Sequence, residues 1–391
     1  MFNATTVLNQ LQHLMPLQQF DRFVGQHKGD RYVKKLTCRN QLSILMYAQG
    51  TGRTSLRDIE QALVVEHKRW YHLGLRTVAK STLARANEKR SYQIYESLFY
   101  KLVEQCQNLR SGTAGFSFKN DLKAIDSSTI DLCLNLFPWA HFRKAKGAIK
   151  LHTVFDIRSQ IPEMVIITDG KCSDIKGIRD IDLSQYAKGT IFVIDRGYTD
   201  YAFLKKIKDA GHYFVIRRKK NAHTLVLRQH RNATGTGVLK DERIDFALEK
   251  AQDDYPDEVR LVTFHDDEHD VTYEFLTNAF RLSAANIASI YKRRWDIELF
   301  FKWIKQHLKI KTFLGTSKNA VMTQIWVAMI YYLLLAWVKG QTKFRGSLLD
   351  LTRIVQTALL KQVSLLNLLS LTPKTIAAAL QRGSPHQASL F

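Results

Sequence analysis

Three acidic residues in this chain of 391 residues lie where a carboxylate could bind a metal ion. Asp126 follows the apolar run LKAI and Asp195 follows IFVI, so we expect each at the carboxyl end of a buried strand. Glu298 stands within the apolar and basic segment YKRRWDIELFFKWIKQ. Mg²⁺ prefers a few carboxylates together with water and phosphate oxygens, and two such ions stabilise both the attacking and the leaving oxygen of a phosphoryl displacement. The three residues therefore suggest metal-dependent phosphoryl transfer.

Each aspartate also has a purely structural interpretation. Asp126 precedes SST and Asp195 precedes RGYTD, so either side chain could instead cap a turn or the start of a helix. A carboxylate at a buried strand end is costly unless it is paired, hydrogen-bonded or bound to metal. The third carboxylate, on a basic helix, favours the metal interpretation.

The helix that contains Glu298 is predicted to carry one polar stripe. At about 100° per residue, Tyr291, Arg294, Glu298 and Lys305 lie on one face within about 60°. A solvated row of ion pairs is the alternative, because Glu298 has a basic residue four positions away on either side. Apolar residues fill most of the remaining circumference, which favours a buried helix whose polar face lines a cleft: Ile297, Phe300, Phe301, Trp303 and Ile304.

The elements expected to position these carboxylates form a mixed α/β sheet. Strand-like runs are LKAIDSST, IKLHTVFDI, EMVIITDG, GTIFVID and HYFVIRRKK, and DYAFLKKIKDAG between the last two has the pattern of an amphipathic helix. Three strands, a connection, a strand, a helix and a strand are typical of a ribonuclease-H-like fold.

We expect five segments along the chain. NLRSGTAGFSFKND is typical of a linker, and the runs HTLVLRQH, EVRLVTFH and VTYEFLTNAF indicate a mostly β region. The predicted segments are a helical N-terminal DNA-binding domain at 1–112, the first part of the ribonuclease-H-like core at 113–218, a β-rich insertion at 219–283, the last part of the core with the catalytic helix at 284–340, and a C-terminal helical segment at 341–391.

The N-terminal region contains two predicted helix starts. Ser55 precedes an acidic residue three positions on, as in a capping box, and Ser81 begins a second helical pattern. Lys80, Arg85 and Lys89 lie close together on that second helix. Two helices with a short linker suggest a helix-turn-helix, and a helical bundle with a solvated basic face is an equal alternative.

The charge of the chain points to a nucleic acid partner. Its 58 basic and 36 acidic residues give a formal charge of +22, and neutralising phosphates requires many Lys and Arg side chains. Residues 205–231 carry nine basic residues and one acid, and residues 139–150, which end at Lys150, carry four and no acid. Arg196, directly after Asp195, is a further candidate for a phosphate contact.

A membrane protein and a disulfide-stabilised secreted protein are not expected. The most apolar run, Ile325 to Val338, has 14 uncharged residues. This is fewer than the roughly 18–20 needed to cross a bilayer, so we predict a buried core helix. The four cysteines form no CxxC pair, and no signal peptide opens the chain. These features indicate a cytoplasmic protein.

The motifs together resemble a known family. The pattern Tyr291-x2-Arg294-x3-Glu298-x6-Lys305 resembles the signature of the DDE transposases of the insertion-sequence-four family. IDSST at Asp126 and DRGY, which ends at Tyr198, resemble that family's two aspartate motifs in order and spacing. The N-terminal segment around GDRYVKKLTCRNQLSILMYAQGTGRTSLRDIE resembles the helical leader of one branch.

The resemblance implies a bacterial cut-and-paste DNA transposase. Asp126, Asp195 and Glu298 would bind two Mg²⁺ ions, with Mn²⁺ as an alternative, and the ends would be cut through hairpins before strand transfer into target DNA. Tyr291, Arg294 and Lys305 would contact phosphates near the cut, and Trp295 would stack on a displaced base. Arg196, Tyr198 and Lys150, which stand in the DRGY motif or in a basic run, are further predicted DNA contacts. The implied partners are double-stranded DNA, as terminal inverted repeats and as target, and a second copy of the chain in a synaptic complex near the nucleoid.

One departure from the family concerns the displaced base. Relatives can use a tryptophan of the β insertion, whereas all six tryptophans here lie outside residues 219–282. Tyr255, Phe264, Tyr273 and Phe275 are the substitutes in that region. HDDEHD, from His265 to Asp270, could bind a metal, but a hairpin turn is the stronger interpretation.

Two alternatives to a transposase remain at this point. One is a ribonuclease-H-like nuclease that cuts without strand transfer. The other is a DNA-binding relative that has lost activity, which the presence of all three carboxylates disfavours.

Overall fold

A computed structural model describes residues 5–69, 73, 75, 77–106, 116, 118–143, 146–230, 237–307 and 313–370. The chain divides into two compact units. A helical unit contains Met1–Leu102, Thr312–Gly315 and Asn319–Phe391, and a sheet unit contains Val103–Lys311 and Thr316–Lys318. Of the linker predicted at residues 108–121, residues 108–115 and 117 lie outside the described residues.

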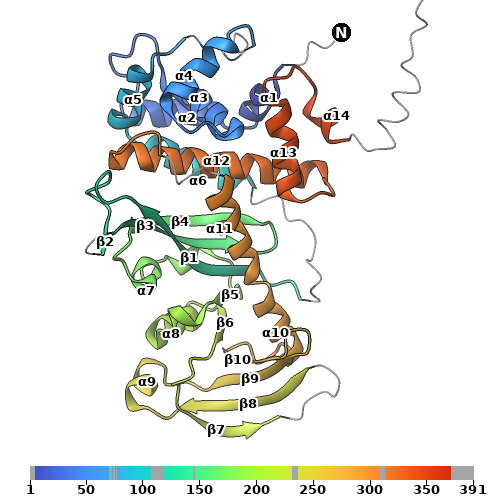
Figure 1. The fold of residues 1–391 in the computed structure, drawn as a ribbon. Coiled ribbons are helices and arrows are strands. Elements are labelled where there is room, and N and C mark those ends of the chain that lie inside the picture. The colour runs from blue at the N-terminus through green and yellow to red at the C-terminus, as the bar shows by residue number, and fades with distance from the viewer. Residues whose placement is uncertain are drawn as a thin grey trace, which may run out of the picture. The chain divides into compact units, whose positions relative to one another are not determined.

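The helical unit joins the two ends of the chain. Its helices are α1 (Val7–His13), α2 (Leu17–Gln26), α3 (Cys38–Thr51), α4 (Leu56–Val65), α5 (Lys80–Lys89), α6 (Gln93–Cys106), α12 (Lys318–Thr342), α13 (Leu348–Ala358) and α14 (Leu365–Leu369) (Figure 1). The backbone N–H groups of Val7 and Leu8 donate to Lys361 and Leu359, and the Phe99 ring of α6 lies 5.1 Å from that of Trp326 in α12.

Helix α12 contains the apolar run that was predicted to be a core helix. It is the one helix among the described residues that is long and apolar enough to cross a membrane, but 83% of its most apolar window is buried inside the structure. This burial confirms the core-helix prediction. The helix belongs to the helical unit, whereas the sequence grouped residues up to 340 with the catalytic core.

The short linker that would make a helix-turn-helix is not present between α4 and α5. Ser55 caps α4 as expected, accepting from Asp58 N, but α5 begins at Lys80 after Ala79 and not at Ser81. Residues 66–79 separate α4 from α5, far more than the 3–4 residues of a helix-turn-helix turn. The Glu60 carboxylate instead accepts from Lys80 N at 3.0 Å, so α4 caps α5 across this long connection.

The sheet unit is built on one ten-stranded sheet. Its strands are β1 (Leu122–Leu132), β2 (His141–Arg143), β3 (Lys146–Asp156), β4 (Ile161–Asp169), β5 (Ile191–Ile194), β6 (Tyr213–Arg217), β7 (Thr224–Gln229), β8 (Val238–Phe246), β9 (Val259–Asp266) and β10 (Val271–Thr277). The order is β2-β3-β1-β5-β6-β10-β9-β8-β7, and β4 also pairs with β3. The pairs β1/β5 and β5/β6 are parallel, and the others are antiparallel.

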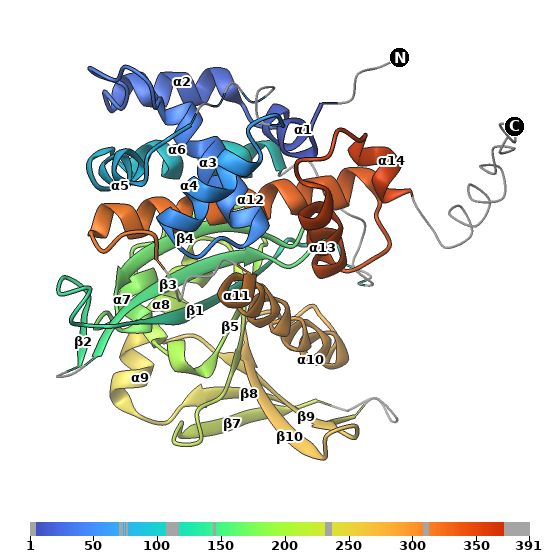
Figure 2. The ribbon, with the colours of Figure 1, turned by 45° about the horizontal axis from the view of Figure 1, so that its top comes forward.

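The mixed α/β prediction is confirmed, with two differences in the insertion. Strand β10 pairs with β6, so the expected β-rich insertion continues the main sheet (Figure 2). It also contains a helix that was not predicted, α9 (Glu249–Asp254). The remaining helices of this unit are α7 (Asp174–Ile178), α8 (Tyr201–Asp209), α10 (Ala284–Lys292) and α11 (Trp295–His307), with short 3₁₀ turns at Leu183–Gln185 and Arg196–Tyr198.

The core explains why the apolar runs form strands. All four side chains of β5 are fully buried, because a central parallel strand is covered on both faces. Phe203, Leu204 and Ile207 of α8, which recur with helical spacing, lie in the same buried cluster as Phe192 and Ile194 of β5. This rigid layer fixes the position of the residues that follow the strand ends, such as Asp195 after β5.

Candidate functional site

Strand register places Asp126 beside Asp195. Strands β1 and β5 run parallel, and the last register pair is Ile125 with Ile194. Each aspartate is the next residue, so the two side chains begin at the same level of the sheet. Sequence reasoning put both at strand ends, and this is wrong for Asp126: β1 continues to Leu132 because it still pairs with β3.

Asp195 also has the structural role that was its alternative interpretation. Its side chain accepts from Gly197 N at 3.0 Å and caps the 3₁₀ turn that follows β5. The second carboxylate oxygen is not used by this cap. A capping role and a metal-binding role are therefore compatible.

The predicted single helix is broken at Arg294. Helix α10 ends at Lys292 and α11 begins at Trp295. Between them the N–H of Arg294 donates to Tyr291 O at 3.0 Å, a bond between residues three apart. The stripe computed for one continuous helix is therefore wrong in geometry, although its members still gather: the Arg294 guanidinium lies over the Tyr291 ring, 5.6 Å from its centroid.

Arg294 connects two of the three carboxylates. Its Nη1 lies 3.2 Å from Asp126 Oδ2, and its Nη2 lies 2.5 Å from Glu298 Oε1. The exposed fractions of the side chains are 15% for Arg294, 18% for Asp126 and 32% for Glu298, so both ion pairs are shielded from water. The apolar side of α11 packs inward as predicted, with Ile297, Phe300, Phe301, Trp303 and Ile304 buried.

The carboxylates influence one another electrostatically. Burial raises the pKa of Asp126 from its ordinary 3.8 to about 6. The Ser127 N–H, 2.7 Å from Asp126 Oδ1, and the Arg294 guanidinium lower this pKa, whereas the charges of Asp195 and Glu298 raise it further. A raised carboxyl pKa that is caused first by burial and increased by two neighbouring carboxylates is typical of functional sites.

The raised pKa predicts a pH dependence of stability without metal. Between pH 3.8 and about 6 the folded state binds a proton that the unfolded state lacks. This contribution is complete below pH 3.8 and is lost as the pH rises through about 6, by about 3 kcal/mol. Urea unfolding in a chelator, below and above this range, should show the loss in the wild type. An equal loss in Asp126→Asn would contradict the assignment to this group.

Two of the three carboxylates, Asp126 and Glu298, line a cleft of about 460 Å³ in the sheet unit, and Asp195 is not among its lining residues. The lining residues are Asp126, Ser127, Ser128, Glu298, Phe301, Lys302, Lys305 and Gln306. Lys302 and Lys305 are exposed on the α11 side. Partly buried carboxylates beside exposed cations suit a phosphate-bearing substrate whose reacting group meets a metal ion.

The other predicted DNA contacts divide into exposed and occupied side chains. Trp295 is 57% exposed, and Arg196 is exposed directly after Asp195. Tyr198 is 2% exposed and packs in the core, so the predicted DNA contact does not fit this conformation. The Lys150 ammonium donates to Asp174 Oδ1 at 3.0 Å and to Cys172 O at 2.9 Å, so it is occupied within the protein.

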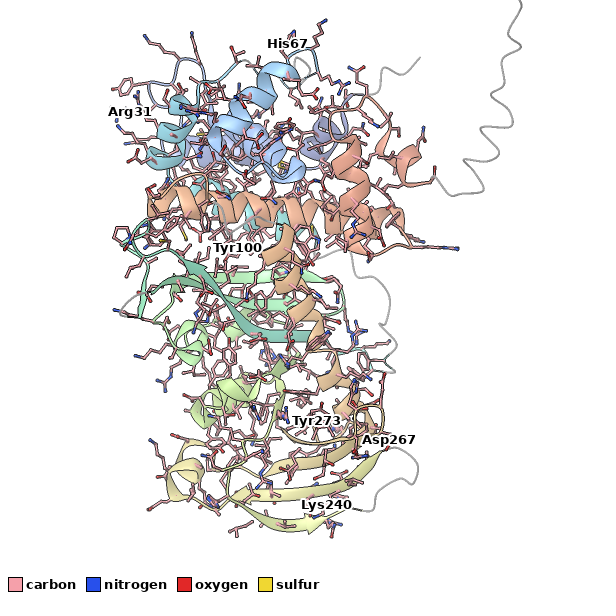
Figure 3. The ribbon with its side chains drawn as sticks, in the orientation of Figure 1. Arg31, His67, Tyr100, Lys240, Asp267 and Tyr273 are labelled. Atoms are coloured by element: carbon pink, nitrogen blue, oxygen red, sulfur yellow. The ribbon has the colours of Figure 1, made fainter. Side chains whose placement is uncertain are left out.

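The four aromatic residues that could replace a base-stacking tryptophan differ in their exposure. Tyr255 and Phe275 are buried, at 0% and 2% exposure. Phe264 and Tyr273 are partly exposed, and Tyr273 is seen on β10 in Figure 3. In the present conformation only the latter two could stack on a base.

Sequence reasoning missed a row of rings that leads to Arg294. Arg217 lies over the Tyr273 ring at 4.9 Å, Tyr273 stacks with Phe275 at 6.0 Å, and Phe275 lies 4.7 Å from Tyr291. Tyr291 in turn lies under Arg294. Through these contacts strand β10 supports the turn between α10 and α11. No local sequence pattern predicts this contact.

The acidic turn predicted at HDDEHD is confirmed as a hairpin. Strands β9 and β10 are antiparallel and flank it, and Asp267 lies in the turn (Figure 3). Asp266, Glu268 and His269 offer ligand atoms within 4.8 Å of one another. His269 Nδ1 already pairs with Asp266 Oδ2 at 3.0 Å, and exposed acidic groups of this kind are common without a metal.

The donor set around Arg294 fits a hard divalent cation. Oxygen ligands from carboxylates are what Mg²⁺ and Mn²⁺ prefer. Two of the three carboxylates already bind a cationic group, the Arg294 guanidinium. Three carboxylates and one guanidinium leave an excess of negative charge, which a divalent cation would neutralise.

Comparisons with known proteins show the family to which this chain belongs. A family model described as "Transposase DDE domain" matches residues 117–334, which include all three carboxylates. A model described as "Domain of unknown function (DUF4372)" matches residues 3–76. The chain is 34% identical over 313 residues to "Putative transposase y4zB" of Sinorhizobium fredii, covering 78% of this chain and 85% of the relative.

Two further similarities are weaker. "Probable transposase for insertion sequence element IS5377" of Geobacillus stearothermophilus is 29% identical over 273 residues, covering 69% of this chain and 70% of the relative. A solved structure, the "piggyBac transposase synaptic complex with hairpin DNA", covers 99% of this chain and 87% of that chain at 11% identity, with a TM-score of 0.45. So low a score does not establish a shared fold.

Proposed function

This chain belongs to the family of transposases with a DDE domain, and from that premise we propose how it acts. It binds the terminal inverted repeats of an insertion sequence, excises the element through hairpin ends and joins the ends to target DNA. The observation that carries the proposal is the ion-paired cluster of Asp126, Arg294 and Glu298, with Asp195 at the next strand end. The strand order β4-β3-β1-β5-β6, with its two parallel pairs, supports a ribonuclease-H-like core.

Each residue of the cleft has a proposed task. Asp126, Asp195 and Glu298 would hold two Mg²⁺ ions, or Mn²⁺, which when bound would supply an activated water and charge stabilisation for phosphoryl transfer. Arg294 and Tyr291 contact the phosphate next to the scissile bond. The buried apolar side of α11 keeps Glu298 in place on a rigid element.

The hairpin route requires that a base leave the stack next to the cut. Trp295 is 57% exposed and adjoins Arg294, so its indole supports this step by stacking on the displaced base. Tyr273 and Phe264 of the insertion are the second choice. A permanganate probe of an unpaired thymine near the end, with wild type and Trp295→Ala compared, tests the assignment.

We further propose a homodimer on DNA. Two transposon ends must be held together while they are joined to one target, and one cleft of about 460 Å³ serves one end. The reaction would take place in the cytoplasm, at the nucleoid. The formal charge of +22 supports binding to both ends and target.

Lys305→Ala is expected to weaken binding to DNA ends. Lys305 is exposed at the rim of the cleft, so the variant should lose one phosphate contact, lower the affinity severalfold and reduce the slope of log K against log salt by about 1. Gel-shift titrations across salt concentrations measure both changes. Lys361→Ala, an exposed lysine of the helical unit, is the matched control, and identical salt slopes for Lys305→Ala and the wild type would remove Lys305 from the DNA contact.

The joining reaction separates the proposal from its alternatives. Purified protein, Mg²⁺ and a DNA carrying the element's terminal repeats are incubated with a target plasmid. A transposase joins the ends to the plasmid, a plain nuclease only cuts them, and an inactive relative binds without cutting. Cleavage without joining would favour the nuclease.

A further inference from the structure

A fourth carboxylate, that of Asp174, contacts Ser127 of strand β1. Asp174 begins the short helix α7, and its Oδ1 accepts from the Ser127 hydroxyl at 2.6 Å. Ser127 directly follows Asp126, and its backbone N–H donates to Asp126 Oδ1 at 2.7 Å. One residue therefore links the catalytic carboxylate to Asp174 by two short hydrogen bonds.

This link occurs just beyond the end of the pairing between β1 and β5. Strand β5 ends at Ile194, so beyond Ile125 no strand among the described residues pairs with β1 on that edge, whereas β3 still pairs with β1 on the other edge. An unpaired strand edge is free to shift unless side chains hold it. The Ser127 hydroxyl bond to Asp174 adds a side-chain contact to β1 at the level where its pairing with β5 has ended.

Asp174 is itself held in place. Lys150 Nζ donates to the same Oδ1 at 3.0 Å and to Cys172 O at 2.9 Å, which attaches the start of α7 to β3. The Lys150 side chain is only 12% exposed. Gly177 of α7 lies so close to the buried His152 ring of β3 that an added Cβ would come within 2.3 Å of it. The helix that carries Asp174 therefore has little freedom to move.

We propose that Asp174 is a positioning residue for the catalytic site, acting through Ser127 on Asp126. It anchors the Ser127 side chain, which orients the Ser127 N–H, which in turn holds the Asp126 carboxylate toward Asp195 and Glu298. Lys150 is the support of this residue and not a DNA contact. The inference rests on the proposed function for its effect on catalysis, and on geometry alone for its effect on cation binding.

The test measures Mn²⁺ binding and DNA cleavage in the full chain. Isothermal titration with Mn²⁺, without DNA, is done on Asp174→Asn, Ser127→Ala and the double variant. Supporting groups of metal ligands typically contribute about 10–100-fold in metal affinity or activity. We expect about a tenfold loss of Mn²⁺ affinity in each single variant and a similar fall in kcat for cleavage, with unchanged affinity for DNA ends.

The double variant tests the route through Ser127. If Asp174 acts through that hydroxyl, the losses are not additive, and the double variant resembles either single variant. Ser127→Thr, which keeps a hydroxyl, should retain most of the Mn²⁺ affinity. Additive losses would overturn the proposed route.

Controls separate positioning from folding and from the proposed function. Asp131→Asn makes the same chemical change at an exposed position of β1 and should match the wild type in every measurement. Should Asp174→Asn not fold, Ser127→Ala alone decides, because wild-type Mn²⁺ affinity in that variant overturns the inference. A wild-type chain that binds Mn²⁺ but cuts no DNA would contradict the proposed function and leave the Mn²⁺ comparison valid.

Discussion

Glu298→Gln is expected to abolish DNA cleavage and to leave the binding of DNA ends almost unchanged. The change removes one negative charge from the cleft and little volume, so α11 should keep its buried contacts. Removing a carboxylate ligand of the metal should lose several kcal/mol of transition-state stabilisation. Because the rate depends exponentially on this energy, the cleavage rate should fall by about a thousandfold or more. Cleavage of end-labelled DNA and gel-shift titration measure the two properties.

The control for Glu298 is a glutamate of the same unit outside the cleft. Glu249 is exposed on α9, and Glu249→Gln should cut DNA at the wild-type rate. Glu298→Gln also leaves Arg294 with a neutral neighbour at one end. A variant that cuts as fast as the wild type would refute the assignment of Glu298.

Arg294→Ala is expected to destabilise the metal-free protein and to stop cleavage. The guanidinium pairs with both Asp126 and Glu298, and the three side chains are 15%, 18% and 32% exposed. Its removal leaves two shielded carboxylates close together without a cation, which should cost about 2–3 kcal/mol of unfolding free energy. Urea unfolding in a chelator measures the loss.

Added Mg²⁺ should reverse part of that loss. A divalent ion supplies the positive charge that Arg294→Ala lacks, so it should stabilise the variant more than the wild type. Cleavage should remain low, because the phosphate contact is gone. Arg353→Ala, in which a 69% exposed arginine loses its pair with Asp350, is the matched control and should change stability by less than about 1 kcal/mol. A stability loss in Arg294→Ala as small as in this control would contradict a stabilising role for the ion pairs of Arg294 with Asp126 and Glu298.

The helix break at Arg294 shows one limit of sequence reasoning. The segment from Tyr291 to Gln306 contains no glycine or proline, and its apolar periodicity is continuous, so nothing local predicts an end to the helix. In the structure, strand β10 packs Phe275 against Tyr291 and holds the end of α10. A contact between residues this far apart in sequence is decided by packing.

Tyr198 and Lys150 show a second limit. Both residue types suit a DNA contact, and both stand in promising motifs. Exposure depends on neighbours that the motif does not contain: Tyr198 is covered by the apolar core, and Lys150 pairs with Asp174, which follows 24 residues later in the chain. The exposed Trp295 and Lys305 fit the same kind of prediction because nothing covers them in the described part of the chain.

Sequence alone predicted the class of chemistry, metal-dependent phosphoryl transfer, and the segments that would carry it out. Buried runs such as IFVI can only be strands or core helices, and carboxylates that follow them need a cation or hydrogen bonds. The tertiary structure decided which carboxylates meet. Asp126 and Arg294 are 168 residues apart, and they pair because strand register and the turn between α10 and α11 bring them together. Local residue patterns report on burial and periodicity, whereas the contacts between distant segments follow from how whole elements pack.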